Sequence, residues 1–108
     1  MGKNVLIIKL SDKPGNQAEL LEKASKGWKI NPSRLQNVTL MLVMFSSVVL
    51  DEFKIGPKLI YHLDTGRVDL ELYDSTNESG LVGKEISYNT YNPATIKRLD
   101  DLAKKVTD

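Results

Sequence analysis

Cysteine is absent from this chain of 108 residues, and histidine and tryptophan occur once each. Without thiols the chain forms no disulfide and offers no cysteine nucleophile or cysteine-bound metal. A lone histidine, His62, leaves no histidine pair for a zinc site, so we expect neither a metal nor another cofactor. These absences exclude thiol-dependent enzymes and argue against a zinc enzyme.

Long hydrophobic segments are also missing. The longest apolar run, residues 38–50, is interrupted by Thr39, Ser46 and Ser47 and is too short to span a bilayer. The stretch VLIIKL near the start is too short for the core of a secretion signal, and a charged Pro-Gly turn follows it. We therefore expect a soluble, cytoplasmic protein without membrane contact.

A strong charge of one sign is lacking as well, since the formal net charge is +1 at pH 7. This balance excludes a protein that holds nucleic acid through bulk electrostatics. The charge is unevenly distributed: residues 1–60 contain nine Lys/Arg and five Asp/Glu, whereas residues 61–108 contain six and nine. An anionic partner should therefore prefer a surface built from the first half of the chain.

The first third of the chain predicts a strand followed by a capped helix. Residues 5–10 are apolar and β-branched, as in a buried strand. Asn16 followed by Glu19 predicts a helix start, and Gly27 is placed to end that helix. Asn31-Pro32 predicts a second, shorter helical turn through about residue 36.

The middle of the chain predicts mainly strands, because large apolar and β-branched residues dominate it. We expect strands at residues 38–46, 48–55, 59–63, 68–73 and 85–88. Ser46-Ser47 should form a tight turn or a bulge, and Gly56-Pro57 should separate two strands. Val68, Leu70 and Leu72 alternate with polar residues, so this strand should turn one face to the core.

The C-terminal segment predicts a helix that opens at Asn92-Pro93. Its apolar residues lie at helical spacing: Ile96, Leu99, Leu102, Ala103 and Val106. The length fits a single domain over residues 1–108. The predicted fold class is α+β, a small curled β-sheet or pseudo-barrel of five to six strands with one helix after the first strand and a C-terminal helix.

Five short elements stand in a fixed order along residues 27–93. They are Gly27-Trp28, residues 42–55, Gly66-Arg67, residues 82–84 and residues 91–93. This order resembles that of short uncharacterised prokaryotic and phage proteins and, more remotely, the PUA-like superfamily with its ASCH, EVE and YTH domains. The resemblance implies a small pseudo-barrel that binds RNA or modified bases in DNA or RNA, rather than an enzyme.

The chain departs from the superfamily at two places. Ser46-Ser47 replaces the usual basic residue and glycine between the long strands, and residues 56–65 lack a second tryptophan. Without that tryptophan, the resemblance does not imply a complete aromatic cage.

Trp28 lies between Lys26 and Lys29, just after the predicted end of the helix. One interpretation is a core tryptophan that closes one end of the barrel, since large aromatic side chains are mostly buried. The other is a wall on which a base stacks, with its edge at the mouth of a pocket. Because the flanking lysines favour exposure of one edge, we predict that Trp28 lines a pocket.

Lys26, Lys29 and Arg34 are candidates for a phosphate-facing patch, because a helix end and the following turn bring them near one another. Solvated surface side chains are the alternative. Lys84 is a further ligand-binding candidate through the Gly83-Lys84 element of the matched pattern. That element is not a P-loop, because the surrounding glycines are missing.

Three more residues are candidates for ligand contact. Arg67 has the geometry to bind a phosphate or a carboxylate with two hydrogen bonds, or to pair with Asp64 or Glu85. Tyr91 and Asn92 are secondary candidates, because the resemblance places them where the barrel opens.

The remaining titratable residues do not predict catalysis. His62 lies in an apolar stretch and should be a packed or edge residue. Asp51-Glu52 and Asp100-Asp101 are neighbours in sequence, so the side chains of each pair diverge and form no catalytic pair.

We therefore predict a binding module that recognises nucleic acid, RNA or DNA, or a modified base in a pocket near Trp28. The alternative is a protein-binding regulatory or phage-encoded module without nucleic-acid contact, which acts through an apolar edge strand. An enzyme on a nucleotide or small metabolite is a third class. The sequence leaves the ligand and the oligomeric state open.

Overall fold

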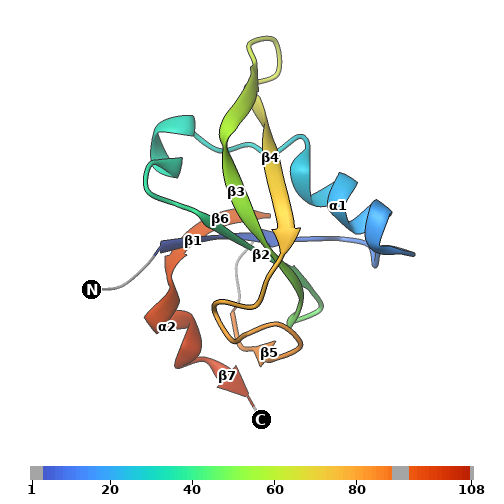
Figure 1. The fold of residues 1–108 in the computed structure, drawn as a ribbon, viewed down its shortest axis with the longest axis vertical. Helices are drawn as coiled ribbons and strands as arrows, with labels where there is room; N and C mark the ends of the chain where they lie inside the picture. The colour runs from blue at the N-terminus through green and yellow to red at the C-terminus, as the bar shows by residue number, and fades with distance from the viewer. Residues whose placement is uncertain (1–3, 89–92, 108) are drawn as a thin grey trace.

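The computed structural model describes residues 4–88 and 93–107. Figure 1 shows one β-sheet with a helix after the first strand and a short helix near the C-terminus. The elements in chain order are β1 (Asn4–Lys9), α1 (Gln17–Ser25), the 3-10 helix η1 (Pro32–Leu35), β2 (Leu40–Phe45), β3 (Val48–His62), β4 (Arg67–Ser75), β5 (Glu85–Ile86), β6 (Ala94–Arg98), α2 (Leu99–Ala103) and β7 (Val106–Thr107).

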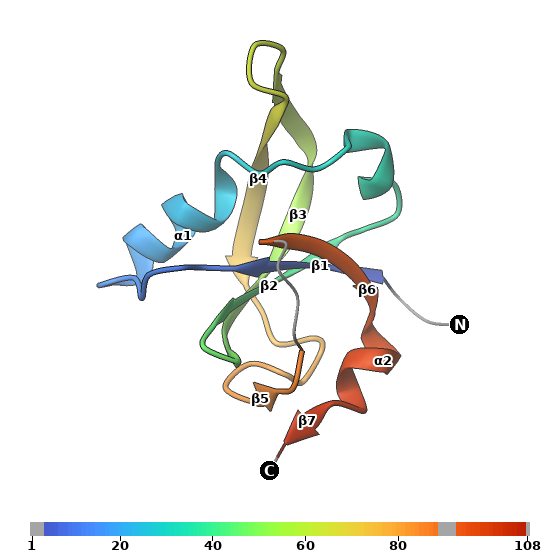
Figure 2. The ribbon, with the colours of Figure 1, turned by 180° about the vertical axis from the view of Figure 1, so that it is seen from behind.

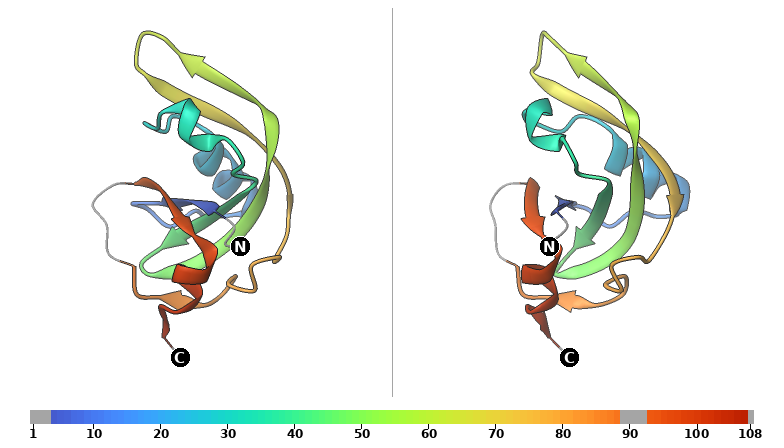
Figure 3. Two further views of the ribbon diagram at one scale, coloured as in Figure 1. Left: turned by 90° about the vertical axis from the view of Figure 1, so that its left-hand side faces the viewer. Right: turned by 60° about the vertical axis from the view of Figure 1, so that its left-hand side comes forward.

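The strands form a mixed sheet in the order β6-β1-β2-β3-β5-β7, with β4 paired to β3 outside this path. β1 and β2 are parallel, and the other pairs are antiparallel. Figure 3 shows β3 and β4 arching together over one side of the molecule. Within the described ranges no pairing joins β6 to β4 or β7, so the sheet curls without closing. This confirms the predicted α+β class.

The start and end of α1 follow from local capping, as the sequence predicts. The Asn16 side chain accepts a hydrogen bond from the Glu19 N–H at 2.8 Å, and Glu19 Oε2 accepts one from the Gly15 N–H at 3.1 Å. Gly27 follows the helix with φ +78°, a left-handed conformation that glycine adopts without strain. Asn31 caps η1 through Ser33 in the same way.

The β2–β3 hairpin turns tightly at Ser46 and Ser47, which have φ values of 51° and 74°. Two positive φ values match the twist of the flanking strands, and a register shift lies nearby at Val43/Met44. The predicted break at Gly56-Pro57 is wrong, because β3 continues to His62. Two shifts in the pairing register of β3 with β4 place this dipeptide in a bulge. At a bulge, the missing Cβ of glycine and the missing N–H of proline do not disturb the strand pairing.

Gly56 has a steric role in this bulge. A Cβ at this position would lie against the Glu71 carboxylate and 3.0 Å from Tyr73 Cζ on the neighbouring strand. The side-chain ends of Glu71 and Tyr73 therefore occupy the space that a Cβ at Gly56 would take.

The predicted C-terminal helix is wrong over its first half, and Val106, expected near its end, lies in β7. Residues 94–98 form β6, which lies beside β1 (Figure 2) and pairs with it so that Ile7 is opposite Thr95. In the described C-terminal segment, only Leu99–Ala103 are helical. The free edge of β1 needs a hydrogen-bonding partner, and this demand outweighs the helical spacing of the apolar residues. The strand predicted at 85–88 is likewise shorter, at Glu85–Ile86.

Two hydrophobic clusters lie on opposite faces of the sheet. Leu6 and Ile8 of β1 belong to the first, with α1 and β4, whereas Val5 and Ile7 belong to the second, with α2. Successive strand residues point to opposite faces, so a strand covered on both sides is apolar throughout. In β4, Val68 and Leu70 are buried and Leu72 packs against the first cluster, which confirms the predicted alternation.

Glu52 is the one charged residue of the described chain that is fully buried. Its carboxylate accepts hydrogen bonds from the Glu78 N–H at 2.8 Å and the Ser79 N–H at 3.0 Å. Its carbonyl oxygen accepts another from the Thr76 N–H at 2.9 Å. The polar loop after β4 is thereby fixed to β3, since an unpaired buried carboxylate would be costly.

No helix in the part of the chain that the structure describes has the length and apolar character needed to cross a bilayer.

Candidate functional site

Trp28 is held against β4 by two backbone hydrogen bonds and against α1 by one from its indole. Its N–H donates to the Val68 carbonyl at 3.0 Å, and its carbonyl accepts from the Val68 N–H at 2.8 Å. The indole Nε1 donates to the Ala24 carbonyl at 2.7 Å, at the end of α1. The half-buried ring packs on the first hydrophobic cluster and also lines a cavity, whereas the stacking of a base on it stays a prediction.

A second set of contacts fixes the junction between α1 and Trp28. Asp69 Oδ1 accepts a hydrogen bond from the Gly27 N–H at 2.8 Å, and Arg67 Nη1 donates to the Gly27 carbonyl at 2.7 Å. His62 Nε2 lies 2.9 Å from Asp69 Oδ2. The hydrogen bond from His62, and then that from Gly27, lower the pKa of Asp69 below its usual value. Arg67 and His62 thus position the backbone that carries Trp28.

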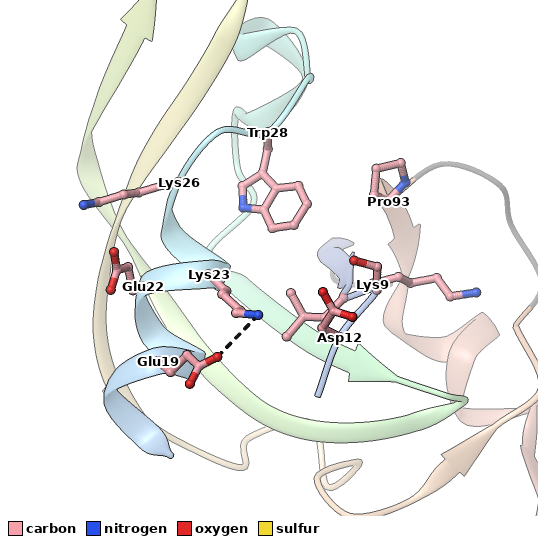
Figure 4. Close-up of a pocket in the computed structure, with 10 residues that line it drawn as sticks. Lys9, Asp12, Glu19, Glu22, Lys23, Lys26, Trp28 and Pro93 are labelled. Carbon is pink, nitrogen blue, oxygen red and sulfur yellow. Dashed lines mark ion pairs between the residues drawn. The ribbon is translucent and has the colours of Figure 1, made fainter. Parts of the chain in front are cut away.

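The cavity beside Trp28 has a volume of about 760 Å³ and lies between α1 and the end of β1 (Figure 4). Leu10 and Pro93 contribute apolar wall, and Pro93 is placed by the hydrogen bond from the Lys9 N–H to its carbonyl at 2.8 Å. The volume falls within the roughly 300–1,000 Å³ of small-molecule sites. We call this space the Trp28 cavity.

The charged groups that line the Trp28 cavity balance: three lysines, Lys9, Lys23 and Lys26, and three carboxylates, Asp12, Glu19 and Glu22. Lys23 Nζ pairs with Glu19 Oε1 at 3.4 Å, and Lys9 Nζ donates to the Tyr88 carbonyl at 3.3 Å. Figure 4 shows the Lys26 ammonium pointing away from the indole and the Asp12 carboxylate across the cavity from it. The cavity is therefore not a concentrated positive site.

The other predicted site residues are not gathered here. Lys29 lines a separate cavity with Tyr61, because adjacent residues of an extended segment point in opposite directions. Arg34 is exposed in η1, and Lys84 is exposed just before β5, at the end of the molecule away from residues 26–31 (Figure 1). Tyr91 and Asn92 lie outside the described residues.

Sequence reasoning missed the contributions of Lys9, Asp12 and Glu22 to the Trp28 cavity. The polar turn directly after a buried strand is the signal that could have found Asp12, since such turns often carry binding residues. Over residues 4–88 and 93–107, no group of three or more His, Asp or Glu side chains is arranged to hold a metal ion.

Comparison with models of known families, with curated proteins and with solved structures finds no match to this chain. The relationship to the PUA-like superfamily stays a prediction.

Proposed function

We propose that this chain is a binding module that takes a nucleobase, or a modified base of RNA or DNA, in the Trp28 cavity. The observation that carries the proposal is an indole ring beside a cavity of about 760 Å³, fixed by one hydrogen bond from its own N–H and by two from its backbone. A ring that is already immobilised loses little conformational entropy when a flat ligand stacks on it. Base–aromatic stacking contributes about 1–3 kcal/mol per base.

The charges of the cavity favour a particular kind of base edge. Asp12 is a hydrogen-bond acceptor across the cavity from the indole (Figure 4), and no ion pair of Asp12 is found among the described residues. Carboxylates accept hydrogen bonds from exocyclic amino groups, which adenine, cytosine and guanine carry and uracil and thymine lack. We therefore expect amino-bearing bases to bind more tightly than uracil or thymine.

Phosphate contacts would come from outside the cavity. Lys26 lies on its rim with the ammonium turned outward, and Lys29 is exposed on the next segment. Two lysines neutralise few phosphates, so the logarithm of the affinity should fall with a shallow slope against the logarithm of the salt concentration. Tight binding that ignores base identity and depends steeply on salt would contradict base recognition in the cavity.

Substitution of Trp28 tests the stacking directly. With a labelled single-stranded oligonucleotide, Trp28→Ala should lower the affinity roughly 5- to 150-fold, the equivalent of about 1–3 kcal/mol. Trp28→Phe should retain much of the binding, because an aromatic face remains. Thermal unfolding of both variants separates lost binding from lost folding. A Trp28→Ala protein that melts normally and binds fully would end the proposal.

Two side-chain changes test the edge contacts. Asp12→Asn should reduce the preference for adenosine over uridine monophosphate, since an amide is a weaker acceptor than a carboxylate. Lys26→Gln should weaken oligonucleotide binding about equally for all sequences. Lys104→Gln is the matched control, because Lys104 is exposed beside α2 and lines none of these surfaces.

A further inference from the structure

The arm of the molecule, residues 56–70, exposes a row of large apolar side chains. Figure 1 shows it projecting beyond the rest of the fold. Leu63 is 88% exposed, Ile60 61%, Tyr61 45% and Leu59 39%. Leu59 and Tyr61 share one face of β3, and Ile60 lies on the other. Soluble proteins expose single apolar residues freely, but several large ones on one hairpin mark an interaction surface.

Two cavities lie side by side along the arm. The Leu59 cavity, of about 450 Å³, has apolar walls from Leu35, Val38 and Pro57. The Tyr61 cavity, of about 410 Å³, is formed with residues 29–32 and the turn at 65–66. Leu59 and Tyr61 are two residues apart on one strand, so they face the same side at a spacing of about 7 Å. This spacing equals the repeat between alternate side chains of an extended peptide.

The charged side chains that line the two cavities are both positive. Lys58 is the only charged residue that lines the Leu59 cavity, and Lys29 is the only one that lines the Tyr61 cavity, among the described residues. Both lysines are exposed, and neither pairs with a carboxylate in the described parts of the chain. The acidic residue nearest in sequence, Asp64, lines neither cavity. An occupant with carboxylates would complement both.

The backbone beside these cavities is an open strand edge. β2 pairs with β3 only as far as Lys54, and the Ile55 N–H then donates to the Thr39 carbonyl at 2.8 Å. Beyond this point, β3 pairs with β4 alone in the described structure. Such an edge carries N–H and C=O groups that another extended segment can use.

We propose that the open edge of β3 binds an extended, acidic segment of a partner protein as an added strand. Main-chain hydrogen bonds would run along residues 58–62, alternate apolar side chains would fill the Leu59 and Tyr61 cavities, and acidic side chains would meet Lys58 and Lys29. A second copy of this chain fits less well, because it would bring the same lysines to the edge and Pro57 offers no N–H. This contact is separate from base binding in the Trp28 cavity.

The test uses a short, blocked, fluorescent peptide of alternating leucine and glutamate, with a leucine–lysine peptide as the control. Fluorescence anisotropy with the full chain should show binding of the acidic peptide only. The double variant Lys29→Glu, Lys58→Glu should lower that affinity at least about tenfold and create affinity for the basic peptide. Charge reversal at Lys104, which is exposed elsewhere, should change neither.

A second experiment tests whether the peptide binds as an added strand. An acidic peptide methylated on alternate backbone nitrogens keeps its side chains but loses donors, so it should bind at least about tenfold more weakly. Amide chemical shifts of residues 56–62 should move on titration with the unmethylated peptide. Equal binding of both peptides, indifference to methylation, or a dimer of the free chain that covers this edge would each overturn the proposal.

Discussion

The Trp28 cavity and the arm differ in how many of their backbone hydrogen-bonding groups are already paired. At Trp28, the backbone is paired with Val68, the indole N–H has an acceptor and the lining charges balance. Along the arm, one edge of β3 is open, apolar side chains are exposed, and each cavity carries a single lysine. The fixed aromatic wall and balanced charges of the Trp28 cavity suit a small flat ligand. The open edge and the lysines of the arm suit a peptide that supplies the missing strand and the opposite charge.

The two regions nevertheless share one strand position. Val68 pairs with Tyr61 on one side and with Trp28 on the other, so the three residues form a row across the sheet. Directly opposed residues point to the same face, and strands lie about 4.8 Å apart. Tyr61 and Trp28 are therefore about 10 Å apart, with the buried Val68 between them.

The largest effect should come from Val68→Ala, which would damage both regions at once. Val68 is fully buried, so loss of two methyl groups and the remaining cavity should cost about 2–3 kcal/mol of unfolding free energy. Urea unfolding measures this cost, and binding of both probes should weaken. Val82→Ala, at a half-buried position of the second cluster, is the matched control and should cost less. A small, equal loss for both variants would disprove the central role of Val68.

Gly27→Ala should affect the Trp28 side alone. Gly27 has φ +78° and open space around the position of a Cβ, so the cost is one of backbone conformation, about 1–2 kcal/mol. Asparagine tolerates this conformation better, so Gly27→Asn should recover part of the loss. Oligonucleotide binding should weaken more than peptide binding. If alanine and asparagine behave alike, backbone strain is not the cause.

Gly56→Ala should affect the arm alone and cost less, about 0.5–1 kcal/mol, because the Cβ meets side-chain ends that are able to move. The mobile partners are the Glu71 carboxylate and the Tyr73 ring. The hydrogen bond to Glu71 raises the pKa of Tyr73, so displacing either group should let Tyr73 titrate at a lower pH. Adding Glu71→Ala should relieve the steric part of the cost. Urea unfolding and absorbance titration of tyrosine check both statements.

Asp69→Asn should have the smallest effect, about 0.2–1 kcal/mol, because the His62–Asp69 pair is partly exposed and an amide oxygen still accepts the Gly27 N–H. The hydrogen bonds from His62 and Gly27 lower the folded-state pKa of Asp69 from 3.8. Asp69 therefore stabilises the fold above that value and loses its contribution as the pH falls further. The difference in unfolding free energy between the wild type and Asp69→Asn should therefore fall to zero in acid. A difference that persists well below pH 3.8 would exclude the carboxylate charge as its source.

Features set by near neighbours in sequence could be predicted. The Asn16–Glu19 cap, the left-handed Gly27 and the turn at Ser46-Ser47 each depend on residues a few positions apart. Propensity and capping act over that range, so the sequence displays them directly. The same holds for the buried alternation in β4, which depends only on side-chain direction.

Features set by distant segments could not be predicted. Ile96 and Leu99 have helical spacing, yet Ile96 belongs to a strand because β1 offers an open edge. The Trp28 cavity combines α1, the end of β1 and Pro93, which no local pattern connects. Lys26 and Lys29 are close in sequence and line different cavities, because the left-handed Gly27 and the paired Trp28 lie between them.

The position of β1 between β2 and β6 has a consequence for synthesis on the ribosome. Residues 5–8 are fully buried, and in the described structure residues 94–98 are the only strand partner on one side of them. At about 5–20 residues per second, the nascent chain waits on the order of 5–20 s between making β1 and making its last neighbour. During that time an apolar strand remains open at one edge. Early contacts with chaperones should therefore concentrate on the first strand, although it ends up as one of the best-protected segments of the finished fold.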